Sequence, residues 1–444
     1  MGAKGSIQCR LGELVEIKHG WPFKSELFAE DLTGRPIVIS VGNFRYTGGF
    51  RFGETVVKEY RGSYPKEFEL APNDILLVMT CQTEGGEILG IPARVPDDGR
   101  VYLHNQRLGK IVVRDKDRVD PNFLYWLFLS GDFNRELVTS ASGTKILHTA
   151  PSRIEAFRFD LPPMDEQHAI AHILGTLNDK IELNRRMSET LEAMALALFK
   201  SWFVDFDPIR AKAEGRDPGL PQPLADLFPA RLVDSKLGEI PERWEVAPLP
   251  DVIEVNPARP LRRGEVAPYL DMANMPTRGH SPDAVIERAF GSGMRFVNGD
   301  TLVARITPCL ENGKTAYVDF LQDGQVGWGS TEYIVLHPKP PIPSEFAYCL
   351  ARSNEFRDFA IQSMTGSSGR QRVPAESFAH YRVLSAPEPI VELFGTLIKP
   401  LFSRASAATT ESRTLAALRG TLMPKLISGE LRVMNAERST RANT

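Results

Sequence analysis

The sequence is poor in several features that define other classes of protein. Its 444 residues contain 4 cysteines, and Cys9, Cys81, Cys309 and Cys349 show no C-x-x-C spacing. We therefore expect free thiols in a reducing compartment and no disulfide framework. No segment reaches the roughly 18 uncharged apolar residues of a membrane helix, and residues 1–15 lack the apolar run of a signal peptide. These absences predict a cytoplasmic protein without membrane contact.

An excess of basic charge is missing as well. The 53 Lys and Arg residues against 56 Asp and Glu residues give a net charge of −3. This balance excludes a protein that coats nucleic acid by bulk charge, but it leaves binding through local basic patches open. The chain is 42% hydrophobic and 25% charged, as globular proteins are. Its length exceeds what one core usually holds, so two or three domains are expected.

Recognisable catalytic motifs are also missing. The sequence has no G-x-x-x-x-G-K-[ST] loop for ATP and no G-x-G-x-x-G after a strand. Asn256 to Arg259 begins like the Asn-Pro-Pro-aromatic loop of amino-methyltransferases but lacks the second proline and the stacking aromatic. His168 and His172 share a helix face without an H-E-x-x-H glutamate or a third ligand. We therefore interpret the first segment as a turn and the histidines as solvated, and expect no catalytic residue, metal site or bound cofactor.

What the sequence does contain is one internal repeat. The offset between Gly143 and Gly366 equals that between Leu161 and Leu384. A period this long excludes a solenoid and predicts two related β-rich globules, each followed by a long helix. The alternative is a duplication that only enlarged the protein.

Three further segments frame the repeat. Helix-like stretches at 121–138 and 344–363 precede the two glycine loops. Between the copies, residues 204–243 carry repeated proline and glycine amid charges, which prevents any long helix or sheet. We expect an extended linker there, with one short helix possible at 224–227.

Two long helices are expected. Residues 166–200 contain no proline and a single glycine, which predicts a helix of about 35 residues and roughly 50 Å. A second helix is expected at about 390–427, where Pro400 should kink it or mark its true start. Apolar residues recur every seven positions, so we expect an antiparallel coiled coil with Asn184 fixing the register; the alternative is that each helix lies on its own globule. The candidate seam residues are Ile170, Leu174, Leu177, Ile181, Asn184, Leu191, Leu198, Leu401, Leu415 and Leu422.

Both globules mix basic, amide and aromatic side chains in presumed loops. Arginine and amide groups can grip base edges in the major groove, while Lys and Tyr hold phosphates. The loops at Gly143 and Gly366 are typical either of a phosphate seat or of a flexible turn. Any single residue is also typical of a solvated surface. The candidate DNA-binding residues are Arg45, Tyr46, Arg51, Arg61, Asn105, Gln106, Arg107, Thr144, Lys145, Arg262, Arg263, Arg278, Arg305, Asn312, Lys314, Arg370, Gln371 and Arg372.

The helical segments carry a resemblance to a known family. Residues 161–167 (LPPMDEQ), 178–184 (NDKIELN) and 197–208 (ALFKSWFVDFDP) resemble the central conserved region of type I restriction-modification specificity subunits. Residues 422–430 (LMPKLISGE) resemble the C-terminal conserved region, and a further match lies at 237–244 (LGEIPERW). Pro400 and the polar middle of the second helix depart from the family pattern.

The resemblance implies an α+β fold with two α/β target recognition domains, joined by two long antiparallel helices that form a coiled-coil spacer. It implies a non-catalytic subunit that reads a bipartite, asymmetric double-stranded DNA target with one globule per half-site. The helix seam would set the gap and dock two methyltransferase subunits, and endonuclease/translocase subunits would join them. S-adenosylmethionine, ATP and Mg²⁺ are then expected on those partners.

Two other functions stay open beside the one that the resemblance implies. One is a self-sufficient methyltransferase or nuclease, which the missing motifs oppose, and the other is a DNA-independent bridging scaffold.

The expected divisions are a first target recognition domain at 1–160, a central conserved helix at 161–203, a linker at 204–243, a second target recognition domain at 244–384, a C-terminal conserved helix at 385–432 and a disordered tail at 433–444.

Overall fold

The chain forms two compact units that share two long helices. The computed structural model describes residues 7–433 except positions 32, 54, 84, 144, 236, 237 and 368, so the expected tail beyond Val433 lies outside the described residues. Unit 1 comprises Met1–Asp179 with Leu415–Thr444, and unit 2 comprises Lys180–Thr414. Helices α5 (Met164–Phe203) and α11 (Glu388–Ile427) each contribute to both units. Within the described ranges, no helix is long and apolar enough to span a membrane.

Unit 1 is built from short strands and short helices. The strands are β1 (Ile7–Arg10), β2 (Val15–His19), β3 (Phe28–Ala29), β4 (Ile37–Val38), β5 (Lys58–Tyr60), β6 (Glu69–Leu70), β7 (Ile75–Val78), β8 (Thr80–Cys81), β9 (Pro92–Arg94), β10 (Tyr102–Leu103), β11 (Leu108–Val113), β12 (Leu147–His148) and β13 (Arg158–Leu161). The helices are α1 (Leu11–Leu14), α2 (Pro121–Phe128), α3 (Gly131–Ser140) and α4 (Pro151–Glu155), with 3-10 turns η1 (Ser25–Leu27), η2 (Val41–Asn43) and η3 (Lys66–Phe68). One sheet is ordered β2-β11-β7-β9 and another β3-β5-β4-β10-β6, while β1 pairs with β13 and β8 with β12.

Unit 2 has the same kinds of element. The strands are β14 (Leu232–Ser235), β15 (Gly238–Pro241), β16 (Glu245–Pro248), β17 (Ile253–Val255), β18 (Val266–Leu270), β19 (Ile286–Ala289), β20 (Met294–Phe296), β21 (Thr301–Ala304), β22 (Thr315–Tyr317), β23 (Gly327–Gly329), β24 (Tyr333–Pro338) and β25 (Arg382–Ser385). The helices are α6 (Asp207–Ala213), α7 (Gln222–Ala225), α8 (Leu249–Val252), α9 (Ser344–Arg352) and α10 (Asn354–Gln362), with the 3-10 turn η4 (Ala375–His380). One sheet is ordered β17-β24-β21-β22 and another β19-β18-β23-β20, while β14 pairs with β15 and β16 with β25.

The predicted internal repeat is confirmed by the matching strand orders. Sheet β2-β11-β7-β9 of unit 1 corresponds to β17-β24-β21-β22 of unit 2, and β5-β4-β10-β6 corresponds to β19-β18-β23-β20. Even the parallel pairs correspond, since β4 with β10 and β18 with β23 are the parallel neighbours in these sheets. Each unit is therefore one copy of a mixed α/β scaffold, followed along the chain by a long helix.

Each of the helix-like stretches at 121–138 and 344–363 forms two helices instead of one. In the first copy Ser130 lies between α2 and α3, and its side chain accepts a hydrogen bond from the N–H of Phe133. In the second copy Ser353 caps α10 in the same way by accepting from the N–H of Phe356. Both serines have extended backbone angles, so an N-cap interrupts each apolar pattern without disturbing its period.

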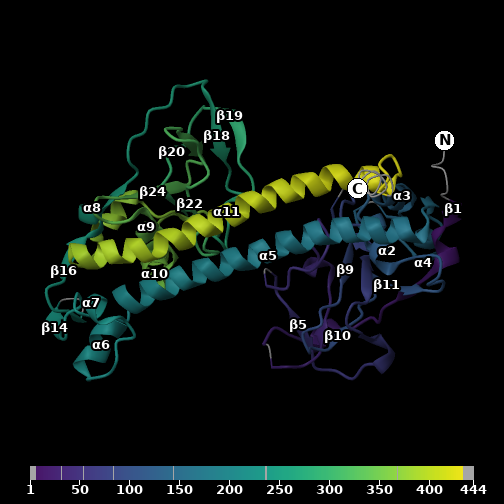
Figure 1. Ribbon diagram of the computed structural model, residues 1–444, viewed down its shortest axis with the longest axis horizontal. Helices are drawn as coiled ribbons and strands as arrows, with labels where there is room; N and C mark the ends of the chain where they lie inside the picture. The colour runs from purple at the N-terminus through teal and green to yellow at the C-terminus, as the bar shows by residue number, and fades with distance from the viewer. Residues whose placement is uncertain are drawn as a thin grey trace, which may run out of the picture. The chain divides into compact units, whose positions relative to one another are not determined.

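Each unit buries part of both long helices in its core. In unit 1, Ile170 and Leu174 of α5 and Leu426 of α11 belong to one buried apolar cluster with the α2 residue Phe123. In unit 2, the ring centroids of Phe199 on α5 and Phe394 on α11 lie 6.1 Å apart. Figure 1 shows the end of α5 beside the start of α11 in this unit. The start of α5 thus meets the end of α11 in unit 1 and the reverse holds in unit 2, so the helices are antiparallel, as predicted.

Asn184 forms a polar contact between the two long helices in unit 2. Asn184 is buried, and its Nδ2 donates to Oε2 of Glu411 at 2.7 Å. Lys180 Nζ lies 3.2 Å from the same oxygen, and the two donors lower the pKa of Glu411. Helix α11 continues through Pro400, so this proline does not mark the true start of the helix.

The predicted seam residues face inward to different degrees. Ile170, Leu174 and Asn184 are fully buried. The half-buried members are Leu177, Ile181, Leu191, Leu198, Leu401, Leu415 and Leu422. Toward the end of α5 the most buried position of the seam lies one residue later than predicted. Phe199 is buried there, whereas the predicted Leu198 is half-buried. Aromatic side chains of unit 2 fill that end of the seam.

The segment 204–243 differs from the extended linker that its composition suggested. It holds α6, α7 and the β14–β15 hairpin, and the helix expected at 224–227 is α7 at Gln222–Ala225. Phe206 packs against Trp244, with ring centroids 5.8 Å apart, and Phe228 packs against Trp202 at 4.9 Å. Proline and glycine limited the length of the helices here, but these aromatic anchors fold the segment onto the core of unit 2.

Candidate nucleic-acid interface

Three loops meet at one end of the sheet β2-β11-β7-β9 in unit 1. Met79 follows β7 and Arg107 precedes β11. The N–H of Met79 donates to the carbonyl oxygen of Arg107 at 2.9 Å, and the N–H of Thr149 donates to the carbonyl oxygen of Met79 at 3.0 Å. We name the residues 79–83, 104–107 and 142–149 loop cluster 1.

Unit 2 repeats this arrangement. Arg305 follows β21 and Glu332 precedes β24. The N–H of Arg305 donates to the carbonyl oxygen of Glu332 at 2.9 Å, and the N–H of Val373 donates to the carbonyl oxygen of Arg305 at 2.9 Å. We name the residues 305–308, 330–332 and 365–373 loop cluster 2. The two clusters are equivalent parts of the repeated scaffold.

Loop cluster 1 presents predicted DNA-binding residues on a tight turn. The N–H of Arg107 donates to Oδ1 of Asn105 at 2.9 Å, which is the geometry of an Asx turn. The N–H of Gln106 donates to the carbonyl oxygen of Trp21 at 3.1 Å. Gln106 and Arg107 are exposed, so a rigid backbone carries their two side chains into solvent.

The second part of loop cluster 1 is the loop between α3 and α4. Gly143 has a φ of 106°, and a Cβ there would lie 2.0 Å from the carbonyl oxygen of Ile146. Only glycine fits this position. Lys145 is exposed beside it, whereas Thr144 lies outside the described residues. The structure thus brings Lys145 to the same cluster as Arg107.

Loop cluster 2 contains a charged triad. Arg372 Nε lies 2.9 Å from both Oε1 and Oε2 of Glu332, and Arg305 Nε lies 3.6 Å from Oε2. Hydrogen bonding to Glu332 raises the pKa of Arg372. Arg370 is exposed and Gln371 is half-buried on the same loop. The structure therefore brings four of the predicted residues into loop cluster 2, and two of them, Arg305 and Arg372, contact the same carboxylate.

Two candidates lie further along the loop that starts at Arg305. Lys314 Nζ donates to the carbonyl oxygens of Met272 and Ala273, the latter at 3.3 Å. Asn312 is exposed. Because its amine already binds carbonyl oxygens of its own unit, Lys314 is the less available of the two for a phosphate.

The remaining candidates lie on other loops of the two units. Arg61 forms an ion pair with Asp31 at 2.6 Å, and Arg51 Nε donates to the carbonyl oxygen of Gly42 at 3.0 Å. Tyr46 is exposed and Arg45 half-buried. The exposed candidates of unit 2 outside loop cluster 2 include Arg262, Arg263 and Arg278.

Two side chains of interest escaped the sequence analysis. Glu332 is one, because nothing in the sequence shows that a single glutamate meets two distant arginines. Arg288 is the other, since its guanidinium lies 4.8 Å from the ring centroid of Tyr269 and 5.8 Å from that of Trp328. The period-2 alternation of strands could have placed Arg288 and Tyr269 on one face only if the strand pairing had been known.

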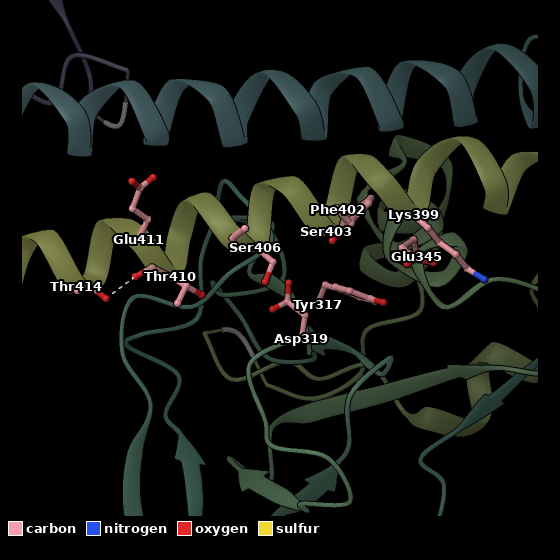
Figure 2. A pocket seen from close by; sticks show the side chains of 11 residues that line it. Tyr317, Asp319, Glu345, Lys399, Phe402, Ser403, Ser406, Thr410, Glu411 and Thr414 are labelled. Carbon is pink, nitrogen blue, oxygen red and sulfur yellow. Dashed lines mark hydrogen bonds between the residues drawn. The ribbon is translucent and has the colours of Figure 1, made fainter.

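A cavity of about 780 Å³ in unit 2 lies beside α11. Figure 2 shows Ser406, Thr410 and Glu411 of α11 among its lining, with Tyr317 and Asp319 from the globule. Burial raises the pKa of Tyr317, so its hydroxyl stays protonated at neutral pH and is no base. Thr414 Oγ1 donates to the carbonyl oxygen of Thr410 in its own helix. Neither of these two hydroxyl groups is therefore activated as a nucleophile or a base.

The motifs that invited a catalytic interpretation are used structurally. Asn256 has a φ of 55°, and its Oδ1 accepts from the N–H of Val335 at 2.9 Å, so its amide side chain binds the backbone of β24. Arg259 pairs with the buried Asp300 at 3.2 Å. His168 and His172 are exposed. Among the residues that the structure describes, no group of three or more His, Cys, Asp or Glu side chains could hold a metal ion.

Comparisons with known proteins agree on one family. Residues 6–193 match the model of the type I restriction modification DNA specificity domain. The HindI type I restriction enzyme specificity subunit of Haemophilus influenzae is 24% identical over 78% of this chain and 86% of its own length. The MjaIX specificity subunit of Methanocaldococcus jannaschii is 26% identical over 72% of this chain and 71% of its own length.

A solved structure supports the same fold. The crystal structure of a type I restriction-modification system S subunit from M. genitalium aligns with 96% of this chain and 99% of its own, with a TM-score of 0.57 and 15% identity. The repeated α/β scaffold with its pair of long helices is therefore shared with that protein. The chain is similar to type I restriction-modification specificity subunits over most of its length, and residues 6–193 match the model of their DNA specificity domain.

Proposed function

We propose that the chain selects the target of a type I restriction-modification complex by reading a bipartite, asymmetric DNA sequence, one half-site per unit. The observation that carries this proposal is the pair of loop clusters. They occupy equivalent places in a repeated scaffold but carry different side chains, Arg107 in one and the Arg305–Glu332–Arg372 triad in the other. Two equivalent backbone scaffolds that carry different polar side chains are suited to the recognition of two different DNA sequences.

Chemistry belongs to the partner subunits in this family, and the specificity subunit has no catalytic activity itself. We propose methyltransferase and endonuclease/translocase subunits as partners, with two methyltransferase copies docked along α5 and α11. S-adenosylmethionine, ATP and Mg²⁺ would act on those partners, and this chain would bind no cofactor. A cytoplasmic location follows from the proposal.

The domain limits are part of the same proposal. Residues 1–160 and 244–384 would be the target recognition domains, and 161–203 and 385–432 the conserved helices that join them. In this arrangement the paired helices fix the gap between half-sites, which should lie about one turn of DNA, roughly 10 base pairs, centre to centre.

A selection from random duplex DNA tests the proposal. The full chain, purified with its partner subunits, is incubated with a randomised duplex library at physiological salt and excess competitor DNA, and bound molecules are sequenced. We expect two enriched blocks separated by an unspecified gap of constant length, because each loop cluster contacts its own half-site. The control is the chain alone with S-adenosylmethionine and Mg²⁺, which should neither methylate nor cleave DNA. Absence of any enriched sequence would contradict the proposal, and a single contiguous block would contradict its bipartite form.

A further inference from the structure

The two loop clusters agree in backbone geometry down to a single turn. In loop cluster 1, the N–H of Arg107 donates to the side chain of Asn105, two residues earlier. In loop cluster 2, the N–H of Glu332 donates to Oγ of Ser330 at 3.1 Å, again two residues earlier. Each turn leads directly into the central strand of its sheet, β11 or β24. Arg107 and Glu332 therefore occupy the same position of the scaffold.

The charges at this equivalent position are opposite. Arg107 is exposed, and its guanidinium contacts no acceptor among the described residues. Glu332 is instead flanked by guanidinium groups from the two neighbouring loops, Arg305 and Arg372. The backbone hydrogen bonds that join these loops make Arg305 equivalent to Met79. They also make Val373 equivalent to Thr149, so the residues directly before them, Arg372 and His148, are equivalent as well. Loop cluster 2 thus carries its arginines where loop cluster 1 has none.

The geometry of the triad favours a fixed arginine. Arg372 meets Glu332 through Nε and through a terminal nitrogen, all at 2.9 Å, so its planar fork is held in one orientation. Another terminal nitrogen lies 3.3 Å from the carbonyl oxygen of Arg370. The side chain of Arg372 is still 40% exposed, against 24% for Glu332. An immobilised guanidinium with remaining donors toward solvent is pre-organised for a bidentate acceptor.

We propose that Glu332 is a positioning residue that aims Arg372 at a guanine edge in the half-site read by unit 2, while Arg107, which takes the place of Glu332 in unit 1, reads a guanine of the other half-site directly. The inference rests on the proposed function and deepens it. Guanine presents O6 and N7 as paired acceptors in the major groove, which an arginine fork can meet with two hydrogen bonds. Arg305 balances the charge of Glu332, so that the carboxylate does not repel the DNA.

Glu332→Gln tests this inference in the selection experiment. Glutamine keeps the size of the side chain but removes the charge that binds Arg372. We expect discrimination at one guanine of one block to fall by about tenfold or more, while the other block keeps its bases. Arg107→Ala should produce the mirror result, with the loss confined to the other block.

The double variant tests whether Glu332 acts by orienting Arg372 or only by stabilising the fold. If Glu332 acts through Arg372, then adding Glu332→Gln to Arg372→Ala should cause no further loss of discrimination. Arg372→Lys supplies an independent check, because it keeps the charge but lacks the fork, and it should also lose the guanine preference. A double variant that loses clearly more than Arg372→Ala alone would overturn the inference.

The outcomes also separate this inference from the proposed function. A wild-type complex that enriches no sequence would contradict the proposed function itself. A wild-type complex that enriches two blocks, together with a Glu332→Gln complex that enriches the same bases with the same preference, would leave the proposed function standing and overturn the role of Glu332.

Discussion

Replacing Leu174 with aspartate is expected to destabilise unit 1 by at least about 3 kcal/mol, because the new carboxylate would be buried without a partner. Leu174 is 0% exposed in the cluster that also holds Ile170 and Leu426. The charge would therefore separate α5 from the core and from the end of α11. Hydrogen exchange of the α2 and β11 peptides in the full chain measures the loss of protection.

Leu183→Asp is the matched control. Leu183 is on the same helix but is 59% exposed, so the same change of side chain should alter stability by no more than about 0.5 kcal/mol. Wild-type protection in Leu174→Asp would show that this face of α5 is not packed. Equal losses in both variants would show that helix propensity, and not burial, decides the effect.

Acidification should destabilise unit 1 through His104, the second large effect. His104 is 3% exposed, and its Nε2 lies 2.9 Å from the carbonyl oxygen of Leu108, which requires Nε2 to carry the proton of a neutral ring. Burial lowers the pKa of His104 to about 4, aided by the charges of Lys110 and His19 and opposed by the Leu108 bond and the charge of Asp74. Between pH 6.5 and about 4, His104 is protonated in the unfolded chain but neutral in the folded one. The free energy of unfolding therefore falls as the pH falls, by about 3 kcal/mol in total.

The measurement is the free energy of opening of β11 from hydrogen exchange, corrected for intrinsic exchange rates, at several pH values. His104→Gln is the control, because its amide can donate to Leu108 but does not titrate in this range. We expect a smaller loss on acidification in the variant than in the wild type. Identical slopes in the two proteins would mean that His104 does not control the acid response.

The helices and the repeat could be predicted from sequence because their signals are local. The heptad spacing from Ile170 to Leu198 and the single glycine in 166–200 required no knowledge of distant residues. The breaks at Ser130 and Ser353 were missed because a serine N-cap leaves the hydrophobic period intact. The folding of 204–243 was missed because Phe206 and Phe228 become anchors only through Trp244 and Trp202.

The residues of the candidate interface could be predicted only in part from the sequence. Arg107 and Arg372 could be selected by residue type, but their places in the two loop clusters depend on the pairing of β7 with β11 and of β21 with β24. Glu332 could not be selected at all, because the two arginines that surround it come from distant parts of the chain. Residues such as Arg61, with its own acidic partner Asp31, show that residue type alone overpredicts the interface. Which side chains touch DNA stays a prediction.

We propose that the two units read two half-sites at a spacing set by the paired helices. Inserting four residues after Glu182 and four after Thr414 lengthens both helices by about 6 Å, nearly two base pairs, and adds a little over one full turn. The Asn184–Glu411 and Arg413–Pro282 contacts of unit 2 remain on one side of both insertions. A four-residue insertion after Gly219, an exposed loop residue, is the control.

Mapping methylated bases in the DNA of cells that express each variant with the partner subunits measures the target directly. For the helix insertions we predict unchanged bases in both half-sites and a gap longer by one or two base pairs, and for the Gly219 insertion no change. An unchanged gap with full activity would show that the helices do not set the spacing, and altered half-site bases would show that the two units do not read the half-sites.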